Sequence, residues 1–343
     1  MNNQWKTFLE SRSAQLDERD NVRFPDAPSV ADCALTDLSP LGLIAITGPE
    51  AADFLQGQLT NDVRELSPSH TQLSAHCSPK GRMLSSFRVM RIDDGFYLQL
   101  PRTRVEATIQ RLRMFLLRAK VAIEDAGDRL IAIGLSGDCA LALLASRFEA
   151  LPEQDNGMAR SGNLALIRIP GPVPRFQVLG PVEAMESLWD ELAAQATPVN
   201  ADCWSLLDIR AGIPTVYPET SDAFVPQMAN LQLIDGVSFT KGCYTGQEVV
   251  ARMQYLGKLK RRMYLAEVST DSAPKPGDEL HSPSSSSEQA SGRVVDARPS
   301  GNGRYALLAV VEIEAAENNE VRLGPDGPLL SFKEPPYGFS AGS

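Results

Sequence analysis

One short segment holds the side chains best suited to chemistry. Residues 241–248 read Lys-Gly-Cys-Tyr-Thr-Gly-Gln-Glu, so two glycines bracket a thiol, a phenol and a hydroxyl. Glycine permits the close approach of a ligand, and a cation near a cysteine favours the reactive thiolate. We therefore interpret Cys243 as a functional thiol that Lys241 or Arg252 activates. The alternative is a glycine turn around a buried, inert cysteine, which is the commoner state of a free cysteine.

The other cysteines and histidines form no second reactive pattern. The five cysteines are far apart in sequence and odd in number, and there are only three histidines. This spacing argues against a disulfide scaffold and against a metal site, and it fits a reducing compartment. The first ten residues lack the pattern of a signal peptide, and no apolar run reaches membrane-spanning length. We therefore expect a cytoplasmic protein with no bound metal and no membrane partner.

Length and charge limit the architecture and the partners. The chain has 343 residues and a net charge of −10. That length favours two or three packed units, and the charge repels nucleic acid, so an anionic partner requires a local basic patch. Arg104, Arg111 and Arg118 would share one stripe of a helix expected at 102–119. A second basic run comprises Lys258, Lys260, Arg261 and Arg262. Either group can also be an ordinary solvated surface.

Hydrophobic periodicity predicts alternating short strands and helices. Strands are expected at 41–46, 73–77, 83–92, 96–100, 164–169 and 176–179, and helices at 102–119, 139–148 and 182–196. A β-rich tail begins near residue 271, and we expect its last segment, 335–338, to be loose. This rhythm indicates α+β units with mainly antiparallel sheets.

Four segments together resemble one family. Residues 241–252 resemble the signature of the YgfZ family, whose members are folate-binding, tRNA-modifying proteins. That family is related to the glycine cleavage T-protein, an aminomethyltransferase, and to the folate-binding domain of MnmE. Residues 54–63, residues 79–84, and the segments 211–214 and 224–227 also resemble motifs of these proteins. The resemblance thus extends over most of the chain.

The resemblance implies a fold, a cofactor and a role. The fold would be α+β, with a three-lobed T-protein-like arrangement around a central channel. Residues 1–265 would form two interleaved folate-binding lobes, and residues 266–343 a C-terminal β-barrel. The cofactor would be tetrahydrofolate or a one-carbon derivative. The protein would serve the assembly or repair of iron–sulfur enzymes, among them a tRNA methylthiolation enzyme, and so support tRNA modification indirectly.

Folate sets clear requirements for its site. Its flat pterin, benzoyl ring and anionic glutamate need an apolar slot, a few directed polar groups and a cation. Tyr244 could stack, Gln247 or Glu248 could form hydrogen bonds, and Arg252 or the second basic run could bind carboxylates. The groups expected to bind the cofactor are Lys241, Tyr244, Gln247, Glu248, Arg252, Asn61, Asp62 and Asp208.

Two departures from the family's pattern bear on activity. Ser85 and Ser86 stand where T-proteins carry paired aspartates, and a hydroxyl cannot replace a carboxylate as a charge partner. Ordinary aminomethyl transfer is therefore not expected, which leaves open whether the protein is an enzyme. Arg210 stands where related proteins often carry glutamate, and Asp208 could take its place. The alternative functions are a folate-dependent one-carbon transferase and an RNA-interaction module.

Overall fold

The computed structural model describes residues 1–17, 21–28, 31–285 and 290–339. The chain forms two compact units, each built from several segments. Unit 1 comprises Met1–Ala52, Glu65–Gln72 and Arg88–Trp204, and unit 2 comprises Asp53–Arg64, Leu73–Phe87 and Ser205–Ser343. Five elements contain a boundary between these segments: α2 (Ala51–Gln56), η1 (Val63–Glu65), β5 (Gln72–Cys77), β6 (Met83–Ile92) and α6 (Ala201–Arg210).

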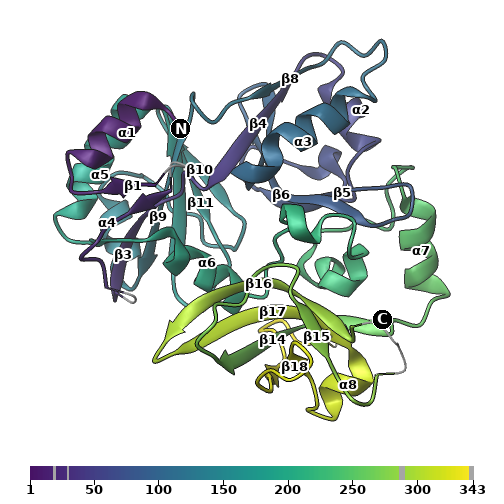
Figure 1. Ribbon diagram of the computed structural model, residues 1–343. Coiled ribbons are helices and arrows are strands. Elements are labelled where there is room, and N and C mark those ends of the chain that lie inside the picture. The colour runs from purple at the N-terminus through teal and green to yellow at the C-terminus, as the bar shows by residue number, and fades with distance from the viewer. Residues whose placement is uncertain (18–20, 29–30, 286–289, 340–343) are drawn as a thin grey trace. The chain divides into compact units, whose positions relative to one another are not determined.

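A six-stranded sheet organises the first part of unit 1. Its order is β10-β11-β12-β9-β3-β13, and only β13 runs parallel to its neighbour. The helices α1 and α5 lie side by side next to this sheet (Figure 1). The strands of this sheet are β3 (Cys33–Asp37), β9 (Ile131–Gly137), β10 (Met158–Ser161), β11 (Leu164–Arg168), β12 (Arg175–Gly180) and β13 (Thr197–Val199). The same part of the chain contains α1 (Asn3–Glu10), α4 (Cys139–Ala145), α5 (Val182–Ala193) and a separate two-stranded sheet of β1 (Gln15–Leu16) and β2 (Val22–Arg23).

Local sequence explains how α1 forms and packs. The Asn2 side chain caps the helix by accepting hydrogen bonds from the backbone N–H groups of Gln4 and Trp5. Trp5 and Leu9 are four residues apart, so they share one face, and both are fully buried. The Trp5 ring packs edge-on against Trp189 of α5, with 5.8 Å between ring centroids. The core of unit 1 therefore joins α1 to α5.

The second sheet of unit 1 carries a helix on one face. The end of β6 pairs with β7 (Gly95–Pro101), which pairs with β4 (Leu41–Thr47), and β4 pairs with β8 (Ala122–Asp125). The helix α3 (Arg102–Arg113) contacts β4, β7 and β8 through buried residues such as Val105, Ile109 and Leu112. These apolar positions recur at helical spacing, which is why the sequence predicted the helix.

The predicted length of α3 was wrong. The helix ends at Arg113, and the next turns close by shorter hydrogen bonds, from Phe115 N to Leu112 O and from Leu116 N to Arg113 O. Leu117 then adopts left-handed backbone geometry with φ 43°, which is incompatible with a continuing helix. Arg118 lies beyond this break, so the three arginines do not share a helical stripe.

Unit 2 combines a small hairpin, short helices and a C-terminal sheet. In it, β5 neighbours β6, and the buried side chains of this hairpin, of the short helices and of the C-terminal sheet form one apolar core. The other elements of unit 2 are η2 (Pro218–Thr220), η3 (Pro226–Ala229), η4 (Leu231–Ile234), α7 (Gln247–Tyr255), β14 (Arg261–Ser269), β15 (Glu279–His281), β16 (Gly292–Gly301), β17 (Arg304–Glu312), α8 (Ile313–Glu317), β18 (Arg322–Leu323) and β19 (Ser331–Lys333).

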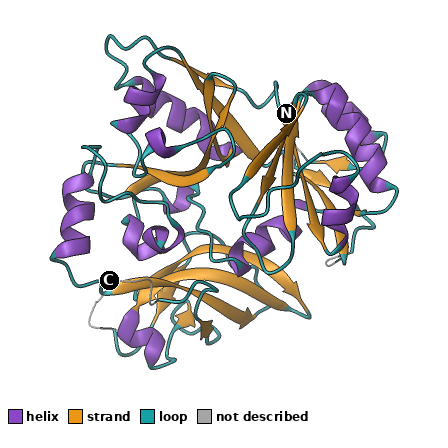
Figure 2. Cartoon of the chain, turned by 180° about the vertical axis from the view of Figure 1, so that it is seen from behind, coloured by secondary structure: helices purple, strands orange, loops and turns teal. Residues whose placement is uncertain are grey.

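The C-terminal sheet is curled but open. Its strand order, β18-β15-β16-β17-β14-β19, is linear, and β18 and β19 lie at its edges. Figure 2 shows the curvature of its long strands. In the part of the chain that the structure describes, the expected β-barrel is thus a half-barrel. A β-bulge at Val295 interrupts the register between Val294 and Asp296, and all three residues are buried.

The mixed architecture with mainly antiparallel sheets is confirmed. Strands were predicted correctly where apolar runs are bounded by turn residues, as for β4 and β6. No helix among the described residues is long and apolar enough to cross a membrane.

One disulfide was not foreseen from cysteine spacing. Cys33 begins β3, opposite Gly137 at the end of β9, and the turn that follows brings Cys139 back to it. Their Cα atoms are 5.6 Å apart, although 106 positions separate them in sequence. The number and spacing of cysteines do not predict this disulfide, because it depends on which strands become neighbours in the sheet.

Replacing both cysteines of this pair by serine should destabilise unit 1. A cross-link that closes so long a loop typically contributes about 2–4 kcal/mol, so we expect a loss of about 3 kcal/mol. Urea unfolding followed by tryptophan fluorescence measures it, since all three tryptophans lie in unit 1. A reductant should lower the wild-type midpoint to that of the double variant, and Cys203→Ser should change little. Equal midpoints for wild type and double variant would refute the prediction.

Candidate functional site

The Cys243 loop, residues 236–247, is attached to the turn formed by residues 57–62. The Thr60 hydroxyl donates to Gly236 O (2.8 Å), and Ser238 N donates to Thr60 O (3.0 Å). At the other end of the loop, Thr245 N donates to Gly57 O (3.4 Å). The two segments, about 180 positions apart in sequence, thus form one structure within unit 2.

Lys241 reinforces this attachment from inside. Its side chain is buried, and Nζ donates to Leu59 O (2.7 Å) and to Asn61 O (2.9 Å). The same nitrogen lies 5.2 Å from the centroid of the Tyr244 ring, within cation–π distance. The amine that was expected to activate the Cys243 thiol is therefore directed at backbone carbonyls and an aromatic face. Its evident role is to hold the loop on the turn.

Two glycines form a second attachment, to the turn at residues 78–82. Gly246 has φ 85° and precedes α7, and an added Cβ there would lie 2.4 Å from Ser78 O. Gly81 has φ 69°, and an added Cβ would lie 2.7 Å from Val249 Cβ. Both positions therefore require glycine for conformation and for space. From the far side, Gln227 Nε2 donates to Val250 O (2.7 Å) and fixes α7.

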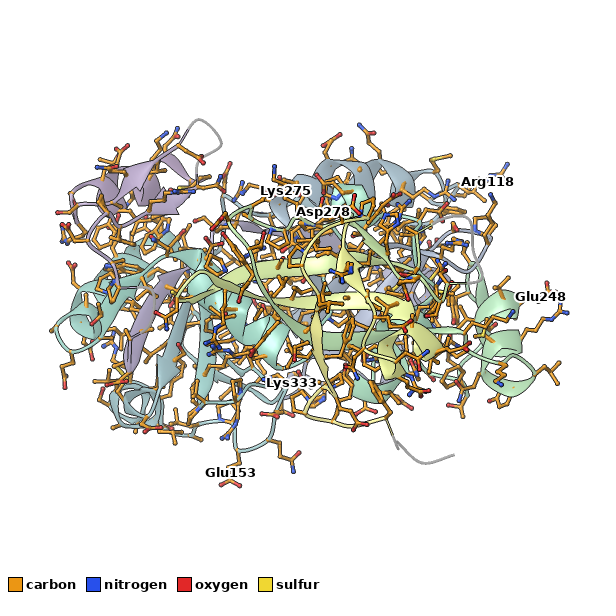
Figure 3. All side chains as sticks on the ribbon, turned by 60° about the horizontal axis from the view of Figure 1, so that its bottom comes forward. Arg118, Glu153, Glu248, Lys275, Asp278 and Lys333 are labelled. Atoms are coloured by element: carbon orange, nitrogen blue, oxygen red, sulfur yellow. A yellow bond between two sulfur atoms is a disulfide. The ribbon has the colours of Figure 1, made fainter. Side chains whose placement is uncertain are left out.

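This framework presents some of the predicted residues and buries others. Cys243 is exposed, as are Glu248 and Arg252 of α7, and Figure 3 shows Glu248 projecting outward from that helix. Tyr244 is buried, and burial raises the pKa of its hydroxyl. Gln247 is half-buried, and its amide nitrogen lies 3.4 Å from Gly242 O. The thiol, one carboxylate and one guanidinium are thus the accessible groups.

Asn61 and Asp62 form the part of the turn next to Lys241. Asn61 Nδ2 donates to Leu73 O (2.9 Å), and its Oδ1 accepts from Asp62 N (2.9 Å). Asp62 Oδ1 accepts from Arg64 N (3.0 Å). Both side chains are half-buried, so they stabilise the turn while part of their surface stays accessible.

Because the amine of Lys241 is buried, its contribution to the free energy of unfolding changes with pH in the alkaline range. Burial lowers the pKa of Lys241 to about 8, Asp62 opposes this shift, and Arg64 adds to it. In the unfolded chain the pKa is about 10.4, so between about pH 8 and pH 10 the unfolded state binds more protons and this group's contribution to stability rises with pH. The neutral amine can still donate to both carbonyls.

Comparison with Lys241→Met isolates this effect. The free energy of unfolding of wild type minus that of Lys241→Met should increase by about 3 kcal/mol from neutral pH to about pH 10. Urea unfolding followed by circular dichroism at several pH values measures it. Parallel pH profiles for the two proteins would show that the amine titrates normally.

Asp208 acts on a different group of side chains, Tyr217, Asp296 and Arg298, which we call the Asp296 cluster. Tyr217 donates its hydroxyl to Asp296 Oδ2 (2.9 Å), and Arg298 donates Nη1 to Oδ1 and Nη2 to the Tyr217 oxygen (3.0 Å). Burial raises the pKa of Asp296 to about 6, and Asp208 adds to this rise while Arg298 opposes it. The cluster ties β16 to the segment that follows α6. Arg210, at the end of α6, is half-buried.

Ser85 and Ser86 are both buried in β6. The Ser86 hydroxyl accepts from Val216 N (3.0 Å) and lies 3.4 Å from Pro214 O, to which it can donate. A serine at this position therefore fixes the backbone after the segment 211–214. Ser85 and Ser86, which stand where T-proteins carry paired aspartates, thus both offer hydroxyl groups. The hydroxyl of Ser86 has a structural role.

The prediction of a loose tail at residues 335–338 was wrong. Tyr337 donates its hydroxyl to Gly212 O (3.0 Å) and accepts from Asn230 Nδ2 (3.3 Å). Phe339 packs edge-on against Tyr264, with 5.1 Å between centroids. Two prolines and a glycine resemble an unstructured end, but the neighbouring aromatic side chains anchor this one.

The second basic run divides between structure and surface. Arg261 pairs with Glu312 (3.1 Å), and the Arg262 guanidinium lies 4.4 Å from the centroid of the Phe339 ring. Lys258 and Lys260 are exposed. Adjacent positions in the sequence therefore serve different roles, because β14 begins at Arg261.

Several residues of the site were not predicted. Ser78 donates to Asp222 Oδ1 (2.7 Å), and Arg82 donates to Ala223 O, which joins the 78–82 turn to the segment before η3. The serine-proline-lysine-glycine sequence at 78–81 is a turn signal that would have located one half of this contact. Asp296 and Arg298 had no such signal, since their partner Tyr217 is about 80 positions away.

Comparisons with known proteins agree with this architecture. A family model described as the GCVT N-terminal domain matches residues 28–171. Among solved structures, the chain is similar to the glycine cleavage system aminomethyltransferase T from Bartonella henselae, with 17% identity and a TM-score of 0.76 over 96% of each chain. It also aligns with the heterotetrameric sarcosine oxidase from Corynebacterium sp. U-96, at 14% identity over 48% of this chain and 87% of that one. The TM-score there, 0.36, is too low to support an argument.

The chain therefore has a T-protein-like fold. At 17% identity this similarity establishes the fold, whereas activity has to be argued from the site.

Proposed function

We propose that this chain is a tetrahydrofolate-binding accessory protein for the assembly or repair of iron–sulfur enzymes, and that it supports tRNA modification indirectly, as in the YgfZ family. The observation that carries the proposal is the exposed thiol of Cys243 on a loop that Lys241 and Gly246 hold in place. The T-protein-like fold supports the folate part. The three-lobed arrangement, the domain division at residue 265 and a cytoplasmic location belong to the same proposal.

The accessible side chains of the Cys243 loop and of α7 are of the kinds that the polar parts of a folate require. Arg252 would pair with the glutamate tail, and Glu248 and Gln247 would accept or donate hydrogen bonds to polar edges of the ligand. Asn61 and Asp62 lie half-buried on the turn to which the Cys243 loop is attached. Bound tetrahydrofolate would supply a one-carbon carrier. The chain's own groups bind and orient it, while Lys241 and Tyr244 support the loop from beneath.

A folate-dependent one-carbon transferase is the second candidate, favoured by a fold similar to that of the aminomethyltransferase T from Bartonella henselae. Ser85 and Ser86 oppose it, because neither can serve as a carboxylate partner for an aminomethyl group. Release of formaldehyde, or transfer of a methylene group from the folate by the purified protein, would favour this candidate. An RNA-interaction module loses support because Arg118 lies outside α3.

Complementation tests the accessory role. In cells that lack the protein, wild type should restore methylthiolation of tRNA, whereas Cys243→Ser should not, although its unfolding midpoint is unchanged. The control is Cys203→Ser, which removes a half-buried thiol in α6. Full activity of Cys243→Ser would exclude the thiol role, and failure of wild type to restore methylthiolation would exclude the accessory function.

A further inference from the structure

The C-terminal end of α7 exposes apolar side chains that a folded protein normally covers. Tyr255 is 68% exposed and Leu256 85% exposed, and both lie in unit 2. The adjoining surface carries Arg252, Lys258 and Lys260, all exposed. We refer to these five residues as the α7 ridge. Large exposed apolar side chains next to one another commonly mark an interaction site.

The α7 ridge is a defined structure and not a frayed helix end. Leu256 N and Gly257 N both donate to Arg252 O (2.9 Å each), which closes the helix. An added Cβ on Gly257 would lie 2.8 Å from Met253 Sδ and 3.0 Å from Met253 O, so the tight turn requires glycine. The Tyr255 ring packs edge-on against Phe239, with 6.2 Å between centroids. Leu256 is therefore held in the position where it protrudes.

The charges of the ridge indicate the character of a partner. Within the described ranges, no ion pair involves Arg252, Lys258 or Lys260. Glu248, one turn earlier on α7, is the nearest acidic side chain on this helix and projects outward (Figure 3). Three exposed cations beside one exposed carboxylate of this helix give the ridge a net positive charge on a chain of net charge −10. Such a surface attracts an acidic partner at long range.

We propose that the α7 ridge docks a protein surface that combines an apolar patch with acidic side chains. Leu256 and Tyr255 would pack against the patch as anchors, and Lys258 and Lys260 would pair with the acidic side chains, since Arg252 is assigned to the folate. RNA fits less well, because Leu256 cannot stack on bases and one edge of Tyr255 is already packed against Phe239. A membrane fits less well, because interfacial helices present a long apolar face, whereas Val250 of α7 is buried.

Direct binding tests the proposal independently of folate and of iron–sulfur enzymes. The main probe is a helical peptide of leucine pairs flanked by glutamates, with an otherwise identical glutamine peptide as its control. Fluorescence anisotropy with the full chain should show salt-sensitive binding of the glutamate peptide only. Leu256→Ser and the double variant Lys258→Glu/Lys260→Glu should each weaken binding at least about tenfold, as expected for an anchor or a charge pair at an interface core.

Matched controls lie on the same unit, away from α7. Leu329→Ser removes another half-exposed leucine, and Lys275→Glu reverses another exposed lysine, and neither should change peptide binding. Unchanged unfolding midpoints show that the ridge variants are folded. The proposal is overturned if the glutamate peptide does not bind, or if the ridge variants bind it normally. It is also overturned if the ridge instead binds an RNA hairpin or vesicles containing phosphatidylserine, with loss in the charge variant.

Discussion

Gly246→Ala is expected to lower the free energy of unfolding by about 4 kcal/mol, since left-handed geometry costs alanine about 1–2 kcal/mol and overpacking adds about 1–3 kcal/mol. The alanine Cβ would lie 2.4 Å from Ser78 O. The contacting atoms are backbone atoms of the 78–82 turn, which cannot move aside as a flexible side chain could. To avoid this contact, the Cys243 loop must move off the 78–82 turn. Folate binding and methylthiolation activity should therefore fall with stability.

Two other glycines of unit 2 separate the causes. Gly303 has φ 69° but open space around it, so Gly303→Ala should show the conformational cost alone, about 1 kcal/mol. Gly242, in the Cys243 loop itself, has open space and no left-handed geometry, so Gly242→Ala should change stability by less than about 0.5 kcal/mol. Urea unfolding followed by circular dichroism ranks the three. A Gly246→Ala midpoint equal to that of Gly303→Ala would show that the loop does not depend on the contact with Ser78.

Asp296→Leu should be the other severe substitution, at a cost of about 3–5 kcal/mol, because removing one partner of a buried ion pair leaves the other uncompensated. Here the Arg298 guanidinium loses its carboxylate, and the Tyr217 hydroxyl loses its acceptor. Urea unfolding at neutral pH measures the loss, and wild-type stability of Asp296→Leu would contradict it.

Asp296→Asn should behave differently from the leucine variant. Its amide oxygen can still accept from Arg298, and the amide avoids the cost of a buried charge. The folded pKa of Asp296, about 6, exceeds the unfolded value of about 3.9, so the folded state binds more protons between these values. The stability of wild type relative to Asp296→Asn should therefore fall by about 2 kcal/mol from about pH 4 to pH 6. A constant difference across this range would show that the carboxyl is not destabilised by burial.

The sequence predicted elements whose signals are local. The strand β6 has the predicted bounds, because a stretch with many large apolar side chains ends at the Asp93-Asp94-Gly95 turn. The end of α3 was missed because residues 114–116 keep an apolar pattern while the backbone turns at Leu117. The apolar pattern there does not mark a buried helix face, because Met114 is 67% exposed and Leu117 is 94% exposed.

The site was partly predictable for a related reason. The Lys241–Gln247 segment was recognisable because its glycines and its thiol are adjacent in sequence. Lys241 donates to the backbone carbonyls of Leu59 and Asn61. Every residue has a backbone carbonyl, so the sequence does not indicate which ones accept. The Asp296 cluster and the Tyr337 anchor likewise join segments of unit 2 that are far apart in sequence. Such contacts follow from the fold, so only the three-dimensional arrangement reveals them.

The measurement that tests the central claim most directly is an anaerobic calorimetric titration of the purified chain with tetrahydrofolate. The account predicts saturable binding to one site, weakened by Arg252→Gln and by Gly246→Ala, and unchanged by Lys275→Gln. Absence of saturable heat with the folded wild-type chain would contradict the assignment of a folate site. The Cys243 loop would then have to be explained as the site of another ligand.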